Sequence, residues 1–291
     1  MTESISRENR IAQLQNEYEN KYFSALDPFL VNAMNYAQFR YSFPFRLALE
    51  QKHLNPEGDY TKVEVPENPF EYAHTYGPDY KLPWLSGRNV LELAAGSKSQ
   101  IDASSVPYSA DPIGSRIAAM NGASVINIDL GIGVEEDANI YNHIQANVCE
   151  YLFGEGENIS DEVREIFDYP QDIIILNGVI FYKNPSREFL IASSKYFDDL
   201  PDFDHQKCDE LFVEMQKFVS IYQNNTFDAL QKLPKLSSYP TIFEYMTLRR
   251  RIIQKTLERA SKVLNEDGVL NIESEFNAIK KDGKMVILSS A

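Results

Sequence analysis

The pattern of apolar and polar residues changes near Asn89. From there to Gly96 a short apolar run ends in small residues, which is typical of a buried strand in a parallel sheet. Residues 124–129 and 172–177 repeat this pattern, and the second of these runs is the most apolar stretch of the chain. Residues 269–274 form another such run. We predict that these four segments are strands of one sheet.

Helix signals lie between the predicted strands. Asp111-Pro112 offers an N-cap residue followed by proline at the first helical position, and Asn121-Gly122 is a typical stop. A long helix is predicted from Tyr239 to Leu264, and Asn265 to Gly268 end it. Near the C-terminus, Asp282-Gly283 between two short apolar segments indicates an antiparallel hairpin. We therefore expect an α/β fold with a Rossmann-like, mostly parallel twisted sheet, flanking helices and this C-terminal hairpin.

Residues 1–85 have a different character. A polar helix is predicted over residues 4–25, and a second helix over residues 28–51 is dense in aromatic side chains. Residues 53–85 are rich in proline, glycine, tyrosine and asparagine and predict ordered coil. We expect this helical and coil extension to cover the active site of a domain formed by residues 86–291. The aromatic side chains are either helix core or part of a pocket that favours cations.

The net charge of the chain limits the classes of partner that it is expected to bind. A net charge of −15 over 291 residues repels phosphate backbones and anionic lipid headgroups, so we expect neither nucleic acid nor membrane as a partner. Two cysteines argue against a disulfide-rich secreted scaffold. The polar N-terminus and the lack of an apolar run of ~20 residues predict a soluble, cytoplasmic protein.

Candidate chemistry lies just after the predicted strands, because ligands of open α/β sheets bind at the carboxyl ends of the strands. Small residues from Ala94 to Gly96 would let a ligand approach the backbone closely. Asp129 ends the second predicted strand, where a carboxylate can accept hydrogen bonds from both hydroxyls of a ribose. Asn177-Gly178 places a polar group beside a permissive backbone position.

Five segments in this order resemble class I S-adenosylmethionine-dependent methyltransferases. They are Val90-Leu-Glu-Leu-Ala-Ala-Gly96, Gly122-Ala-Ser-Val-Ile-Asn-Ile-Asp129, Gln145-Ala-Asn-Val-Cys149, Asp172-Ile-Ile-Ile-Leu-Asn-Gly-Val-Ile-Phe-Tyr182 and Ala260-Ser-Lys-Val-Leu-Asn-Glu-Asp-Gly-Val-Leu270. The resemblance implies a Rossmann-like domain that binds S-adenosylmethionine and transfers its methyl group. It says little about the acceptor.

The resemblance also implies a role for individual residues. Contacts to the methionine part of the cofactor would come from the first loop and the strand at 172–177, and contacts to the adenosine from the segments after the second strand. These cofactor-binding candidates are Glu92, Ala94, Ala95, Gly96 and Asn177 for the methionine part, Asp129 for the ribose, and Leu130, Asn147 and Val148 for the adenine. Phe181 and Tyr182 would face the acceptor.

The chain departs from the family pattern in three places. Ser97 and Lys98 follow Gly96, where the family often has a further glycine. The loop at 97–110 is long, and we expect it to fold over the cofactor as a lid. Residues 184–238 form a large insertion, which we expect to be helical and to shape the acceptor pocket.

Each candidate also has an ordinary structural interpretation. Glu92 could be a satisfied buried acid, and Asp129 could cap the end of its strand. A nicotinamide dinucleotide would also want an acid at Asp129, but the Gly-x-Gly-x-x-Gly pattern it needs is missing after the first strand. Arg249-Arg-Arg251 is typical of a solvated helix face. The acidic residues, His205 and Cys208 within 202–209 match no common metal site, so we expect no metal.

Methyl transfer is an in-line displacement at an activated carbon, so the protein mainly has to align the reactants and exclude water. A base is needed only if the acceptor must lose a proton, and Tyr182, His143 and His74 are the candidates for it. A small-molecule acceptor that is neutral or cationic suits the acidic surface, and a protein side chain is also compatible. The competing hypotheses are a non-catalytic binding protein of the same fold and a nucleotide-dependent oxidoreductase.

Overall fold

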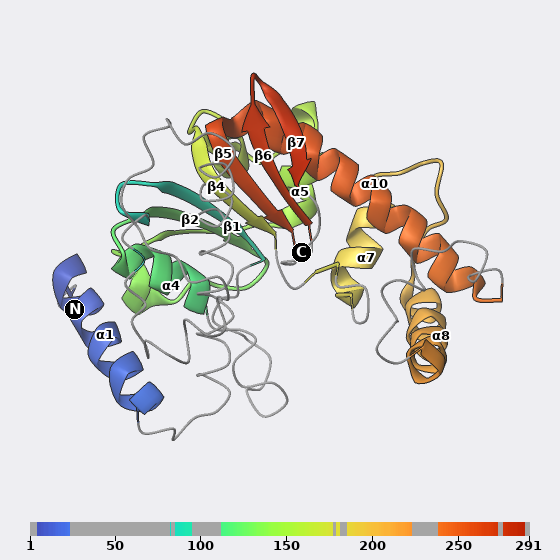
Figure 1. Ribbon diagram of the computed structural model, residues 1–291, viewed down its shortest axis with the longest axis horizontal. Helices are drawn as coiled ribbons and strands as arrows, with labels where there is room; N and C mark the ends of the chain where they lie inside the picture. The colour runs from blue at the N-terminus through green and yellow to red at the C-terminus, as the bar shows by residue number, and fades with distance from the viewer. Residues whose placement is uncertain are drawn as a thin grey trace.

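A computed structural model of the chain describes residues 5–23, 82, 85–94, 112–176, 179–180, 185–222, 238–272 and 276–288. Within these residues one seven-stranded sheet forms the centre of an α/β fold (Figure 1). Its strands are β1 (Asn89–Leu93), β2 (Ser124–Asp129), β3 (Asn142–Gln145), β4 (Gln171–Leu176), β5 (Leu264–Ile272), β6 (Phe276–Lys281) and β7 (Lys284–Leu288).

The strand order is β3-β2-β1-β4-β5-β6-β7. The first five strands pair in parallel, and β6 and β7 add to β5 as an antiparallel hairpin, as the sequence predicts. The order of the parallel strands is that of a Rossmann-like sheet, in which the chain direction across the sheet reverses between β1 and β4. Ligands of such sheets bind at this reversal, outside the carboxyl ends of the strands.

Helices cover both faces of the sheet, because its strands alternate apolar side chains to either side (Figure 1). On one face, Val90, Val125 and Ile175 share a core with α4 (Ile113–Met120) and with α1 (Arg7–Phe23), which packs on α4. The other face carries the larger core. Its helices are α5 (Val148–Phe153), α6 (Asp161–Ile166), α7 (Arg187–Ser194), α8 (His205–Tyr222) and α10 (Pro240–Val263).

The structure confirms the helices predicted at 112–121 and 239–264, with small differences at their ends. Pro112 occupies the N-cap position of α4 rather than its first turn, and Asp111 lies outside the described residues. Asn265 to Gly268 end α10 as predicted, but they are already part of β5. Asp282 and Gly283 form the hairpin turn, both with the positive φ that a two-residue turn of this kind requires.

The N-terminal extension is described only in part. Its first helix, α1, packs on α4 through Leu14 and Tyr18, which are both buried. The second predicted helix, at 28–51, lies outside the described residues, and so does the predicted lid at 97–110. The insertion at 184–238 contributes α7 and α8, which pack beside α10 (Figure 1). Among the helices described, none is long and apolar enough to cross a membrane.

Candidate functional site

The carboxyl ends of β1, β2 and β3 are level with one another. Leu93 lies opposite Ile128 in the parallel register, and Asp129 lies opposite Gln145. Ala94 continues the ladder beyond β1, since its amide donates to the Ile128 carbonyl over 2.9 Å. Ala94 itself has φ 57°, a left-handed conformation that is uncommon for a residue with a side chain.

Glu92 lies one residue before the end of β1 and is fully buried on the α4 side of the sheet. The Ser115 hydroxyl, in the first turn of α4, donates to its Oε2 over 2.6 Å. A Cβ on Gly114 would lie 2.1 Å from Oε1, so only glycine lets this turn approach the carboxylate. The positive end of the helix dipole favours a carboxylate in this position.

Asp129 is half-buried at the end of β2. Its Oδ1 accepts the Gly131 amide over 2.9 Å, which forms a tight turn directly after the strand. The next side chain, Leu130, is 57% exposed, and Ile132 is 43% exposed. The structure therefore places a carboxylate and an exposed apolar side chain next to each other at the edge where ligands of this fold bind.

Two β3 side chains hold this turn from the opposite side. The Nε2 of His143 lies 2.9 Å from the Gly131 carbonyl, and the Gln145 amide donates to the Leu130 carbonyl over 3.3 Å. The imidazole also packs against Gly133, where a Cβ would lie 2.8 Å from the ring. His143, a candidate base, is thus tied to the backbone of the β2–β3 connection through one of its two nitrogens.

Asn147 is the N-cap of α5, whose first residue is Val148, and lies two residues after the end of β3. The Asn147 Oδ1 accepts the Cys149 amide over 2.9 Å and so caps the helix. Of its polar side-chain atoms, Nδ2 would be the one to meet a ligand. The Val148 side chain is buried in the larger core, so a ligand would meet its backbone rather than its side chain.

The remaining candidates Ala95, Gly96, Asn177 and Tyr182 lie outside the described residues, as do Phe181 and His74. The segment after β4 is described again at Ile180, whose carbonyl accepts from the Tyr245 hydroxyl over 3.0 Å and from the Arg249 Nε over 2.9 Å. Arg249 is buried, so the prediction of a solvated helix face is wrong for this residue. It instead fixes the chain that follows β4.

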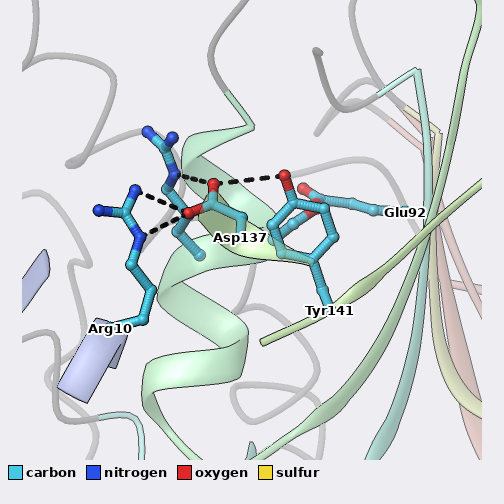
Figure 2. Close-up of polar contacts among 6 residues, drawn as sticks. Arg10, Glu92, Asp137 and Tyr141 are labelled. Atoms are coloured by element: carbon cyan, nitrogen blue, oxygen red, sulfur yellow. Dashed lines mark hydrogen bonds and ion pairs between the residues drawn. The ribbon is translucent and has the colours of Figure 1, made fainter. Parts of the chain in front are cut away.

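The structure also shows a polar cluster that the sequence did not reveal (Figure 2). Asp137, in the short helix η2 (Glu135–Asp137), is fully buried between α1 and α4. Its Oδ1 pairs with Arg10 of α1, at 2.8 Å from Nε and 2.7 Å from Nη2, and its Oδ2 lies 2.6 Å from the Nε of Arg116 of α4. The Tyr141 hydroxyl lies 3.4 Å from Oδ2. Each carboxylate oxygen thus has its own arginine.

The pKa values of Arg116 and Tyr141 are both raised in this cluster. Burial alone would lower the pKa of Arg116, but the neighbouring Tyr18 and Asp137 outweigh burial and raise it. Burial raises the pKa of Tyr141, and the nearby Asp137 charge raises it further, so the hydroxyl stays protonated. Arg116 therefore stays positively charged beside Asp137.

A groove of about 1,140 Å³ follows the outer edge of β3 toward α6. Neither Glu92 nor Asp129 lines it, so it is separate from the reversal point of the sheet. In the acidic stretch at 202–209, Asp204 caps α8 by accepting the Lys207 amide over 2.8 Å, and Cys208 is buried. Within the part of the chain that the structure describes, no three histidine, cysteine or acidic residues gather as metal ligands would.

Comparisons of the chain with protein-family models, with curated proteins and with solved structures found no match.

Proposed function

We propose that the protein binds S-adenosylmethionine at the carboxyl ends of β1 and β2 and transfers its methyl group to a small-molecule acceptor. The observation that carries this proposal is the pair formed by Asp129 and Leu130. The carboxylate ends β2, beside the point where the sheet reverses, and the neighbouring leucine is 57% exposed. This pairing suits an adenosine, because its ribose needs a hydrogen-bond acceptor and its base needs an apolar surface.

Asp129 would have two tasks in this site. An ionised carboxylate has about four acceptor positions on its two oxygens, so it can accept from the Gly131 amide and from a ligand hydroxyl at the same time. The ribose hydroxyls would take positions on this carboxylate while the turn stays intact. Leu130 would pack on the adenine, and the Asn147 Nδ2 would donate to the adenine edge.

The first loop fits the methionine part through its backbone. Ala94 directly follows β1 with a φ of 57°, and the resemblance to the family implies that its backbone lies along the methionine part. Glu92 lies two residues before Ala94 and accepts from the Ser115 hydroxyl. We assign Glu92 the task of holding the first turn of α4 against the end of β1.

S-adenosylmethionine supplies a methyl group on a positively charged sulfur, which is already activated for displacement. The protein then has to align the acceptor, exclude water and, where the acceptor requires it, remove a proton. Arg249 and Tyr245 contribute to alignment, since both fix the Ile180 carbonyl in the segment that follows β4. The competing hypothesis is a binding protein that uses the same site to recognise the cofactor but transfers no methyl group.

Calorimetry on the purified protein tests the proposal. We expect S-adenosylmethionine and S-adenosylhomocysteine to bind with micromolar dissociation constants, and NADH to bind far more weakly. Release of S-adenosylhomocysteine in the presence of a panel of small amines, phenols and carboxylic acids then separates an enzyme from a binding protein. Tight binding of NADH alone would replace this proposal by a nucleotide-dependent oxidoreductase.

Two variants of Asp129 locate the site. Asp129→Asn can keep the turn to Gly131 but loses the charge, whereas Asp129→Ala loses both. Hydrogen bonds to a charged group contribute about 1.5–3 kcal/mol each, so losing two should weaken binding by at least about 100-fold. We expect both variants to show this loss, with Asp129→Ala the less stable protein. Unchanged affinity in Asp129→Asn would show that the ribose does not bind to this carboxylate.

A further inference from the structure

The β2–β3 connection, residues 130–141, begins with Leu130 and contains Asp137. Apart from the three residues of η2, it has no regular structure of its own. Its position therefore depends on the contacts that hold it. His143 and Gln145 hold its first residues, and Asp137 anchors its far part in the protein interior.

The anchor at Asp137 comes partly from the N-terminus of the chain. Arg10 reaches Asp137 from 127 positions earlier in the sequence, and the Asn139 side-chain amide donates to the Ile5 carbonyl over 2.9 Å. The helix that carries Arg10 is itself held on α4 by the buried Leu14 and Tyr18. The N-terminal segment thus contacts the connection at two points, through Ile5 before α1 and through Arg10 within it; Figure 2 shows the contact of Arg10 with Asp137.

The second arginine ties the same carboxylate to α4. Arg116 follows Ser115, the residue that holds Glu92. The first half of α4 therefore contacts both the end of β1 and the connection that leaves β2. The Asp137 anchor is thus linked through α4 to the end of β1, and through the connection to the end of β2.

We propose that Arg10 is a positioning residue for the adenosine part of the cofactor. It acts through Asp137, which places the β2–β3 connection and with it Leu130. The cofactor part of this inference rests on the proposed function, whereas the link between α1 and the connection does not. Docking of α1 and binding of the cofactor are then coupled, so that each favours the other.

The test compares Arg10→Met with Arg7→Met. Methionine keeps most of the apolar stem of arginine and removes its charge, and Arg7 is an exposed residue of the same helix. Hydrogen exchange measured by mass spectrometry should be faster at residues 130–141 in Arg10→Met and unchanged in Arg7→Met. Affinity for S-adenosylhomocysteine should fall about fivefold or more in Arg10→Met only.

Two further variants distinguish the proposed positioning role of Arg10 from a merely structural one. Leu130→Ala combined with Arg10→Met should lose less affinity than the two single losses added together, because both act on the same contact. Arg10→Lys keeps the charge and should recover part of the affinity. Additive losses, or exchange at residues 130–141 that equals the wild type, would overturn the inference. If the wild type binds no S-adenosylhomocysteine, the proposed function fails, and the exchange data still decide whether Arg10 positions the connection.

Discussion

Replacing Asp137 by asparagine should destabilise the protein far more than breaking an exposed ion pair. The substitution keeps the shape of the side chain but leaves Arg10 and Arg116 without the carboxylate that compensates them. Their side chains are only 14% and 10% exposed, so water cannot replace the lost partner. Removing one member of a buried ion pair costs about 3–5 kcal/mol.

The pair between Asp161 and Arg164 provides the matched control. The Arg164 Nη1 lies 2.8 Å from the Asp161 Oδ1, but the Asp161 side chain is 89% exposed. An exposed pair contributes about 0–1 kcal/mol, so Asp161→Asn should leave the stability almost unchanged.

Thermal unfolding followed by circular dichroism measures both variants. At about 2 °C per kcal/mol for a chain of this size, Asp137→Asn should lower the midpoint by roughly 6–10 °C. Urea unfolding at one temperature gives the free energy directly and shows whether the variant starts from a native fold. Equal shifts in Asp137→Asn and Asp161→Asn would refute the claim that burial makes this cluster important.

Two further predictions concern close packing and high pH. Gly114→Ala should cost about 1–3 kcal/mol, because its Cβ would collide with Glu92, and the cost measured by urea unfolding should shrink in a chain that also carries Glu92→Ala. Burial raises the pKa of the Cys149 thiol to about 12 and also raises the pKa of Tyr141 and of Tyr151. The folded state keeps these protons while the unfolded state releases them, so stability is full below the unfolded pKa and is lost as the pH rises above 9.0, the ordinary value of a cysteine. Urea unfolding should show a lower midpoint at about pH 11 than at about pH 8, and equal midpoints would contradict this reasoning.

The main strands and long helices could be predicted because each leaves a periodic apolar pattern. Strand β3 could not, since Asn142-His-Ile-Gln145 is mostly polar and forms only because β2 offers an edge to pair with. Similarly, Asn265 to Gly268 have the composition of a turn, yet they lie in β5. Asp267 adopts φ 65° there, and the register between β4 and β5 shifts nearby. Pairing with neighbouring strands decides such segments, and this pairing is not local in the sequence.

The position of Asp129 could be predicted because it directly follows a recognisable strand. The Asp137 cluster could not, because Arg10, Arg116 and Asp137 come from three separate segments of the chain. Each looks like an ordinary surface charge in its own segment. The burial of Arg249 was missed for the same reason, since its partner at Ile180 lies 69 positions away. Charges become buried partners only when the fold brings their segments together.

A crystal structure of the protein with S-adenosylhomocysteine tests the central claim most directly. We expect the ribose hydroxyls on the Asp129 carboxylate and the adenine on the Leu130 side chain, at the carboxyl ends of β1 and β2. Density for the ligand at another place, such as the groove along β3, would contradict the proposed site. Crystals that take up no ligand at concentrations well above micromolar would contradict the proposed function itself.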